Sequence, residues 1–229
     1  MTGMVVYRRP VDAVRLSVEP RLASWDRAGH PSQVALAGFL AHVDALTAPV
    51  VAAIRGQVAV DLAVGLPGTV PLIDGGRDLD NYLLPVARQL GPGRVAAAFG
   101  RKIHGPSSLA VGPADPEPAV AAPQFSTRMT GSYERTQWKQ DLHDRLLQAQ
   151  AAPMDPGPAA MTIAITTGPG RNWTNLWKPL IDSFGPVLGE DPARPYHPRD
   201  DRIVNLGLHH HTDGSLGHDV IIDAWWTRS

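Results

Sequence analysis

The stretch GGRDLDNYLLPVARQLG, residues 75–91, is followed later in the chain by a second stretch of similar pattern, RNWTNLWKPLIDSFG, residues 171–185. When the two are aligned, the identical residue pairs include Asn81 and Asn175, Pro85 and Pro179, and Gly91 and Gly185. Glycine and proline at matched positions punctuate a chain in the same way. Both stretches are therefore predicted to form a helix that follows a strand.

The reactive side chains are divided between the two stretches. The pairs that differ in charge include Asp78 and Asn172, Asp80 and Thr174, and Leu84 and Lys178. The first stretch thus has two acids, and the second has the lysine.

The similarity extends outward in the same order in both halves of the chain. Apolar residues at helical spacing occur in 32–47 and 134–151, and a strand-like run follows in 57–68 and 159–170. After the repeated stretch, residues 93–114 and 201–226 each have the pattern of two short strands joined as a hairpin. Each half is predicted to be helix, strand, helix, strand, strand. An internal duplication explains this order, and the alternative is two halves that share a pattern by chance.

These patterns predict an α+β protein with a first half at 1–111 and a second at 126–229. Residues 112–125, which begin GPADPEPAVAAP, are rich in proline and are predicted to be an extended linker, poorly suited to helix or sheet.

Composition limits the classes of function. The net charge is −1 and neither half is basic, so a DNA-binding surface must be a local patch. The chain has no cysteine, which excludes disulfides and thiolate metal sites. No transmembrane helix, membrane association or secretion signal is expected, and a cytoplasmic location is the remaining expectation.

Asp78 and Asp80 are candidate ligands of a hard divalent cation. If this segment is extended, the period of two directs both carboxylates to one side. Carboxylates so placed suit Mg²⁺, which polarises a phosphoryl oxygen and activates water in phosphodiester cleavage. The structural alternative is that Asp80 or Asn81 caps the helix that begins near Tyr82.

The RDLDN segment, together with the N-x-x-K-P-x-x-D pattern of the second stretch, resembles the RusA family of Holliday-junction resolvases. This resemblance implies a D-x-D-N motif, a lysine three residues after the asparagine, and a later D-D-x-x-V segment with another metal-binding aspartate. Five candidate residues match these positions: Asp78, Asp80, Lys178, Asp200 and Asp201. By the resemblance, Asp78, Asp80, Lys178 and Asp201 are catalytic, and the four aspartates bind Mg²⁺.

The family acts as a homodimer of about half this length, so the resemblance implies two RusA-like halves fused as a pseudo-dimer. The implied function is a Mg²⁺-dependent, structure-selective endonuclease acting on branched or distorted DNA in recombination and repair. Two arrangements stay open: one composite active site built from both halves, or two incomplete sites. In the second case, the chain is a catalytically inactive module that binds DNA or a protein partner.

A second candidate site is the run HHHTDGSLGHDV, residues 209–220. On a strand His209 and His211 share a face, and His218 returns across a hairpin, which is an arrangement that suits a transition metal. The structural alternative is an ordinary strand end and turn.

Overall fold

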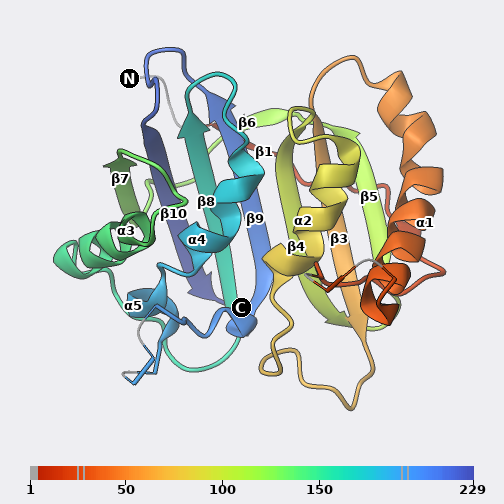
Figure 1. Cartoon of the computed structure of the whole chain (residues 1–229), viewed down its shortest axis with the longest axis horizontal. Coiled ribbons are helices and arrows are strands. Elements are labelled where there is room, and N and C mark those ends of the chain that lie inside the picture. Colours follow the sequence, from red (N-terminus) through yellow and green to blue (C-terminus); the bar gives the residue numbers. More distant parts are fainter. Residues whose placement is uncertain (1–4, 25, 28, 192, 195) are drawn as a thin grey trace.

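The computed structural model describes residues 5–24, 26–27, 29–191, 193–194 and 196–229. Its centre is one mixed sheet of eight strands in the order β2-β5-β3-β4-β9-β8-β10-β7 (Figure 1). The strands of this sheet are β2 (Val14–Arg15), β3 (Val58–Leu66), β4 (Val95–His104), β5 (Ser108–Pro113), β7 (Phe125–Met129), β8 (Ala159–Thr167), β9 (Ile203–Thr212) and β10 (Val220–Arg228). The predicted α+β class is confirmed.

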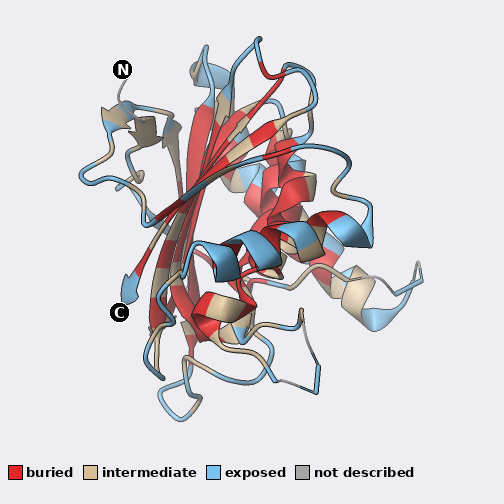
Figure 2. Cartoon of the chain, turned by 90° about the vertical axis from the view of Figure 1, so that its left-hand side faces the viewer, coloured by how far each residue is buried: buried red, intermediate tan, exposed pale blue. Residues whose placement is uncertain are grey.

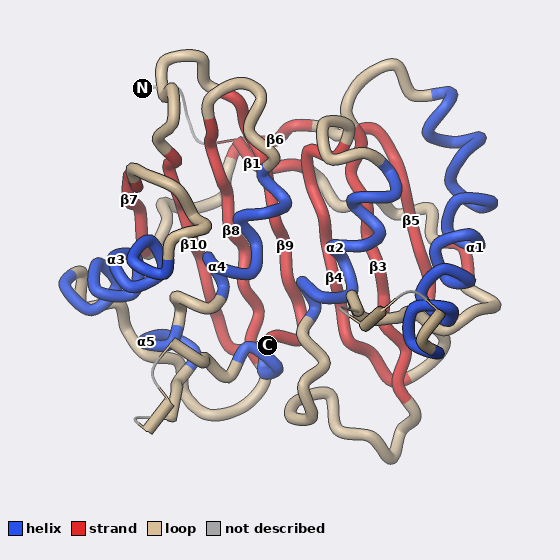
Figure 3. The backbone as a smooth tube through the Cα atoms, in the orientation of Figure 1, coloured by secondary structure: helices blue, strands red, loops and turns tan. Residues whose placement is uncertain are grey.

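The helices cover one face of the sheet, and the most deeply buried residues lie between the two layers (Figure 2). They are α1 (Pro31–Ala53), α2 (Leu79–Leu90), α3 (Thr136–Gln148), α4 (Trp177–Ile181) and α5 (Gly185–Leu188), with short 3₁₀ segments η1 (Trp173–Leu176) and η2 (Asp200–Arg202). Figure 3 shows α2 and α4 on either side of the middle of the sheet. The predicted order of helix, strand, helix, strand, strand is present in both halves, although the second helix of the second half is divided.

The predicted hairpins are wrong. β4 and β5 do not pair with each other, because β3 lies between them, parallel to β4 and antiparallel to β5. In the same way β8 lies between β9 and β10. The reason is burial: β3 and β8 are apolar and almost wholly buried, and such a strand needs a hydrogen-bonded neighbour on each side.

The pairing pattern is the same in the two halves. Read outward from the middle, β4-β3-β5-β2 and β9-β8-β10-β7 have the same sequence of parallel and antiparallel neighbours. Each half also has a register shift at its first pair, between Val58 and Ala59 and between Ala159 and Ala160. The halves meet where β4 pairs antiparallel with β9, with Phe99 opposite Gly207 at the middle of this pairing. Strand pairing therefore identifies equivalent positions in the two halves.

A proline lies inside the repeated helix in both halves, with different outcomes. In α2, Pro85 has no N–H to donate to the carbonyl of Asn81, and the backbone N–H of Ala23 donates to that carbonyl instead, at 2.8 Å. This substitute bond satisfies the carbonyl within a continuous helix. Pro179 lies in the five-residue α4, and the chain there is split into η1, α4 and α5.

The predicted linker contains a short strand. β6 (Pro116–Pro118) pairs with β1 (Val5–Tyr7) in a separate two-stranded sheet. Proline is tolerated in so short an edge strand because one side of the strand has no ladder to complete. Figure 2 shows this small sheet on the face that carries no helices. The predicted poor fit of this segment to a sheet is therefore wrong in β6, and also at the two ends of the segment, which belong to β5 and β7.

Helix α1 bears on the expectation that the chain has no transmembrane helix. It extends beyond the predicted 32–47 and, by length and composition, is long and apolar enough to cross a membrane. Its buried residues Leu36, Phe39 and Val43 belong to the main core, while Val34 and Val50 are exposed. In this fold α1 covers the sheet near β5.

Candidate metal centre

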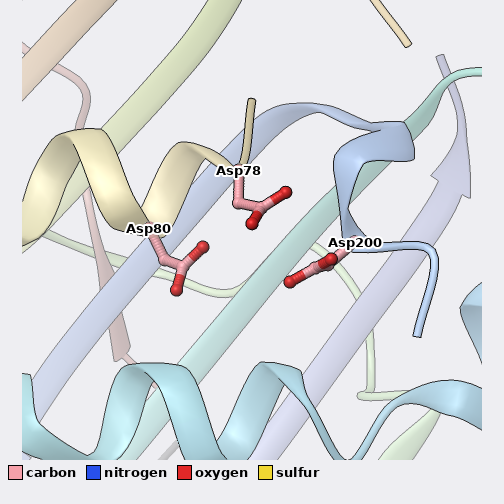
Figure 4. A group of neighbouring side chains, drawn as sticks. All are labelled: Asp78, Asp80 and Asp200. Atoms are coloured by element: carbon pink, nitrogen blue, oxygen red, sulfur yellow. The ribbon is translucent and has the colours of Figure 1, made fainter. Parts of the chain in front are cut away.

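Three aspartates from distant parts of the chain meet on the helical side of the sheet. Asp78 and Asp80 lie at the start of α2, and Asp200 begins η2, just before β9. Figure 4 shows their carboxylates directed into a common space, and one oxygen from each lies within 4.8 Å of the others. The antiparallel pairing of β4 with β9 produces this meeting, because it places the start of β9 beside the start of the helix that precedes β4.

The predicted extended geometry of the first two acids is wrong. Asp78 is the N-cap residue of α2, and Asp80 lies in the first helical turn. The two carboxylates reach the same space through a helical turn, not through strand alternation.

Asp78 does not use its side chain as a cap. Its Oδ2 accepts a hydrogen bond from Nδ2 of Asn81 at 3.1 Å. Its Oδ1 is buried and has no hydrogen-bond partner in the described part of the chain. A buried carboxylate oxygen without a donor is costly, and a cation satisfies it. This orphaned oxygen fits a metal ligand better than a helix cap.

Asp80 is the most buried member of the trio, with 3% of its surface exposed. Burial raises its pKa to about 7, and the neighbouring carboxylates Asp200 and Asp78 act in the same direction, while Lys178 opposes them. Burial also raises the pKa of Asp78, with a further contribution from Asp200. Burial is thus the main reason why ionisation of Asp78 and Asp80 is unfavourable, and the charge of Lys178 offsets it only in part.

Asp200 and Asp201 have different positions, although the sequence offered both as ligands. Only Asp200 joins the trio. The carbonyl oxygen of Asp201 accepts a hydrogen bond from Lys102 at 2.6 Å, and its carboxylate accepts a long one from the N–H of Gly76 at 3.4 Å. Asp201 therefore fixes the loops around the site and lies outside the three-carboxylate group.

Lys178 lies among these acids, as in the composite one of the two arrangements that the sequence left open. Its Nζ is 2.8 Å from Oδ2 of Asp200, 3.0 Å from Oδ1 of Asp182 and 3.9 Å from Oδ2 of Asp78. Burial works against its charge, but the carboxylates of Asp80, Asp200 and Asp182 outweigh burial and raise the pKa of Lys178. Lys178 is therefore a permanent cation at the edge of the trio.

Lys102 is a second lysine at the site, and sequence reasoning missed it. It lies on β4, is 3% exposed, and donates to the carbonyl of Asp201. Burial lowers its pKa to about 8, while Asp78, Asp201 and Asp200 favour its charge. The signal was present in the sequence: alternation along β4 puts Lys102 on the same face as the buried Ala98.

An open pocket of about 710 Å³ adjoins the trio. Asp78 and Asp200 line it, as do Arg194 and Arg199 of the loop before β9. Arg199 is also paired with Asp74 at 3.2 Å. Asp74 does not belong to the trio.

Arg202, the last residue of η2, has a structural role. It is buried, and its guanidinium donates to the backbone carbonyls of Leu188 at 2.6 Å and Gly157 at 2.8 Å, and also to that of Asp155. A side chain so enclosed holds two loops against the start of β9 and does not reach the pocket.

The histidine run does not form a metal cluster. His209 and His211 share a face of β9, as predicted, but both pack against Tyr7 of β1, with ring centroids 6.2 and 5.0 Å away. His218 lies in the loop before β10, where its carbonyl accepts a hydrogen bond from Arg171. Within the described residues, the acid trio is the only group of three ligands close enough to hold an ion.

The donor set of Asp78, Asp80 and Asp200 can hold a metal ion, because it supplies three converging carboxylates of which one has an unsatisfied oxygen. Comparison of the chain with protein-family models, curated proteins and solved structures finds no match.

Proposed function

We propose that this protein is a Mg²⁺-dependent, structure-selective DNA endonuclease of RusA-like type with one composite active site. The observation that carries the proposal is the meeting of Asp78 and Asp80, from the first half, with Asp200 and Lys178, from the second. The acids of the first repeated stretch and the lysine of the second are therefore close enough to act in one site.

The chemistry follows from the donor types. All-oxygen ligands with net negative charge favour a hard cation such as Mg²⁺. When bound, Mg²⁺ supplies stabilisation of the phosphoryl oxygens and activation of the attacking water. Asp78, Asp80 and Asp200 hold the ion, and Lys178 stabilises the negative charge that grows on the phosphate as the P–O bond to the leaving strand breaks. Asp182 and Asp200 position the ammonium group of Lys178.

The proposal includes an internal duplication, in which two RusA-like halves form a pseudo-dimer within one chain. The same strand order in both halves, the register shift at the same place and the symmetric β4–β9 pairing support it. Under this proposal, residues 1–111 and 126–229 replace the two subunits of a homodimer, and 112–125 joins them.

A single composite site implies a single cut. A resolvase needs two symmetric incisions, and the position equivalent to the trio has Asn172 and Thr174 in place of Asp78 and Asp80. The expected product is therefore a nicked branched duplex.

The test is cleavage of a labelled four-way DNA junction with Mg²⁺ or with EDTA. Asp80→Asn is expected to abolish nicking, and Asp115→Asn, an exposed acid of the linker, is expected to have no effect. Nicking that persists in Asp80→Asn excludes the trio as the active site. DNA binding without any cleavage by the intact protein favours the alternative, an inactive binding module.

A further inference from the structure

The pseudo-symmetry of the sheet defines a second position equivalent to the metal centre, at the other end of the β4–β9 pair. Each charged group of the metal centre has a counterpart there: Asn172 for Asp78, Thr174 for Asp80, Leu84 for Lys178, Arg88 for Asp182, Pro92 for Asp200 and His210 for Lys102. The last two pairs follow from the equivalence of β4 and β9. Pro92 and Asp200 precede the first residues of these strands, Val95 and Ile203, by the same number of residues, and Lys102 and His210 follow them by the same number. Every acid of the first site has become neutral or basic in the second.

This second position is a pocket of about 360 Å³. Asn172, His210, Pro92 and Gln57 are among its lining residues. It adjoins a larger pocket of about 790 Å³, and the two share Gly170 and Arg171 as lining residues. None of the described residues that line either pocket is acidic, whereas six acids line the pocket of the metal centre.

Arg171 is fixed between the two pockets. Its guanidinium donates to the carbonyls of His218 and, at 3.3 Å, Gly131, and lies over the ring of Tyr133 at 5.7 Å. These direct contacts are to neutral groups. The acid whose charge reaches Arg171, Asp219, is already paired with Arg128 at 2.6 Å, so the charge of Arg171 stays available to an anion. The position of the cation is set before any ligand arrives, which lowers the entropy cost of binding.

His210 forms an inner wall of the smaller pocket. It is 8% exposed, stacks on the ring of Trp173 at 5.0 Å and hydrogen-bonds Thr167 at 2.9 Å. The stacking and the hydrogen bond leave the imidazole with a fixed orientation, so the pocket is preformed.

We propose that these two adjoining pockets form a metal-independent binding site for the phosphodiester backbone of a nucleic-acid strand. The proposal rests on the proposed endonuclease function and assigns its second, degenerate half-site: the metal centre cuts one strand while Arg171 holds the other. An elongated site with a fixed guanidinium and no acidic lining suits a chain of phosphates. The metal centre is not such a site, because its acids repel phosphate when no cation is present.

The experiment measures fluorescence anisotropy of a labelled single-stranded oligonucleotide and a labelled four-way junction, in EDTA at low salt. Gln57→Glu is nearly isosteric and adds one negative charge to an exposed side chain of the smaller pocket. Arg171→Gln removes the central cation. Arg15→Gln is the matched control, because it removes the same charge from an exposed residue on β2, at the opposite edge of the sheet.

Gln57→Glu and Arg171→Gln are each expected to weaken DNA binding by about fivefold or more and to reduce its salt dependence, whereas Arg15→Gln stays close to the intact protein. Asp80→Asn is expected to bind DNA at least as well as the intact protein in EDTA. Equal affinity of Gln57→Glu and the intact protein overturns the proposal, as does a lack of DNA binding in EDTA.

A competition arm separates a strand from a free anion. If inorganic phosphate displaces the oligonucleotide at the same concentration of phosphate groups, the site binds phosphate alone and the strand proposal fails. Failure here is distinguishable from failure of the endonuclease proposal, because Mg²⁺-dependent nicking and its loss in Asp80→Asn are measured independently.

Discussion

Lys178 Nζ lies 3.9 Å from Oδ2 of Asp78, although the two residues belong to different halves of the chain. The same ammonium group contacts Asp200 and Asp182 more closely. One lysine thus connects the acids of the first half to those of the second. This is the geometry that a motif divided between two copies needs if its parts act together.

Substitution of Lys178 separates metal binding from catalysis. Lys178→Met removes a cation from among carboxylates, so divalent cations are expected to bind the trio about as tightly as before or more tightly. Cleavage is expected to fall by about 100-fold, because charge on the phosphate loses its stabilising partner. Calorimetry with Mn²⁺ and the nicking assay measure the two effects. A parallel loss of Mn²⁺ affinity and cleavage would show that Lys178 holds the trio in place and is not catalytic.

Ionisation of Asp80 is expected to lower the free energy of unfolding of the metal-free protein as pH rises. Its pKa is 3.8 ordinarily and about 7 in the fold, so between these values the folded state binds more protons than the unfolded chain. Stability conferred by protonated Asp80 is therefore lost as pH rises from about 4 to 7. Asparagine cannot ionise, so in EDTA the free energy of unfolding of Asp80→Asn is expected to exceed that of the intact protein by about 1 to 4 kcal/mol at pH 8.

Urea unfolding at several pH values checks this difference. The gain of Asp80→Asn over the intact protein should be near zero at pH 4 and should grow through the window. A gain that is the same at all pH values would mean that packing, not ionisation, causes it. Asp115→Asn, at an exposed site, is the control and should show no such trend.

Metal binding is expected to have the opposite pH dependence. The ion needs ionised carboxylates, and Asp80 is protonated below about pH 7. Saturating Mn²⁺ should therefore raise the melting temperature at pH 8 by several times the rise at pH 5.5, following mass action. The measurement is a thermal melt with and without Mn²⁺ at both pH values. An equal rise at both, or a rise that survives in Asp78→Asn, would place the ion elsewhere.

Arg199 and Arg202 both precede β9, and their substitutions are expected to differ in their effect on the free energy of unfolding. Arg202→Met leaves the buried carbonyl of Leu188 and the half-buried carbonyl of Gly157 without this donor and is expected to cost about 2 to 5 kcal/mol. Arg199 is exposed and pairs with the exposed Asp74, so Arg199→Met is expected to cost less than about 0.5 kcal/mol. Chemical denaturation of both variants checks the comparison, and equal costs would contradict the structural role of Arg202.

Local patterns were enough to predict the elements but not their neighbours. The strand-like run in residues 57–68 and the helical spacing in 134–151 correspond to β3 and α3, since these local patterns depend only on which residues face the core. Pairing between strands is not a local property. The chain could not show that β3 lies between β4 and β5, because that placement depends on the burial of both faces of β3 in the assembled sheet.

The candidate site was likewise predicted in part. Asp78, Asp80 and Lys178 were identified from the repeated motif, because each copy has what the other lacks, and Asp200 came from the D-D-x-x-V segment that the resemblance implies. Lys102 was missed, since a lone lysine on an apolar strand has no motif around it. Asp201 was offered beside Asp200, and only the turn of η2 determines which of two adjacent acids faces the trio.

The sequence by itself determined that one motif occurs twice and that its acids and its lysine stand in different copies. Only the tertiary structure decided that they meet, since the antiparallel β4–β9 pairing brings the start of α2 to the start of β9 and to α4. The physical reason is that residue type and spacing describe only the local conformation of the chain. The strength of an interaction between a carboxylate and an ammonium group depends on the distance between them in space, and the pairing of strands across the whole sheet sets that distance.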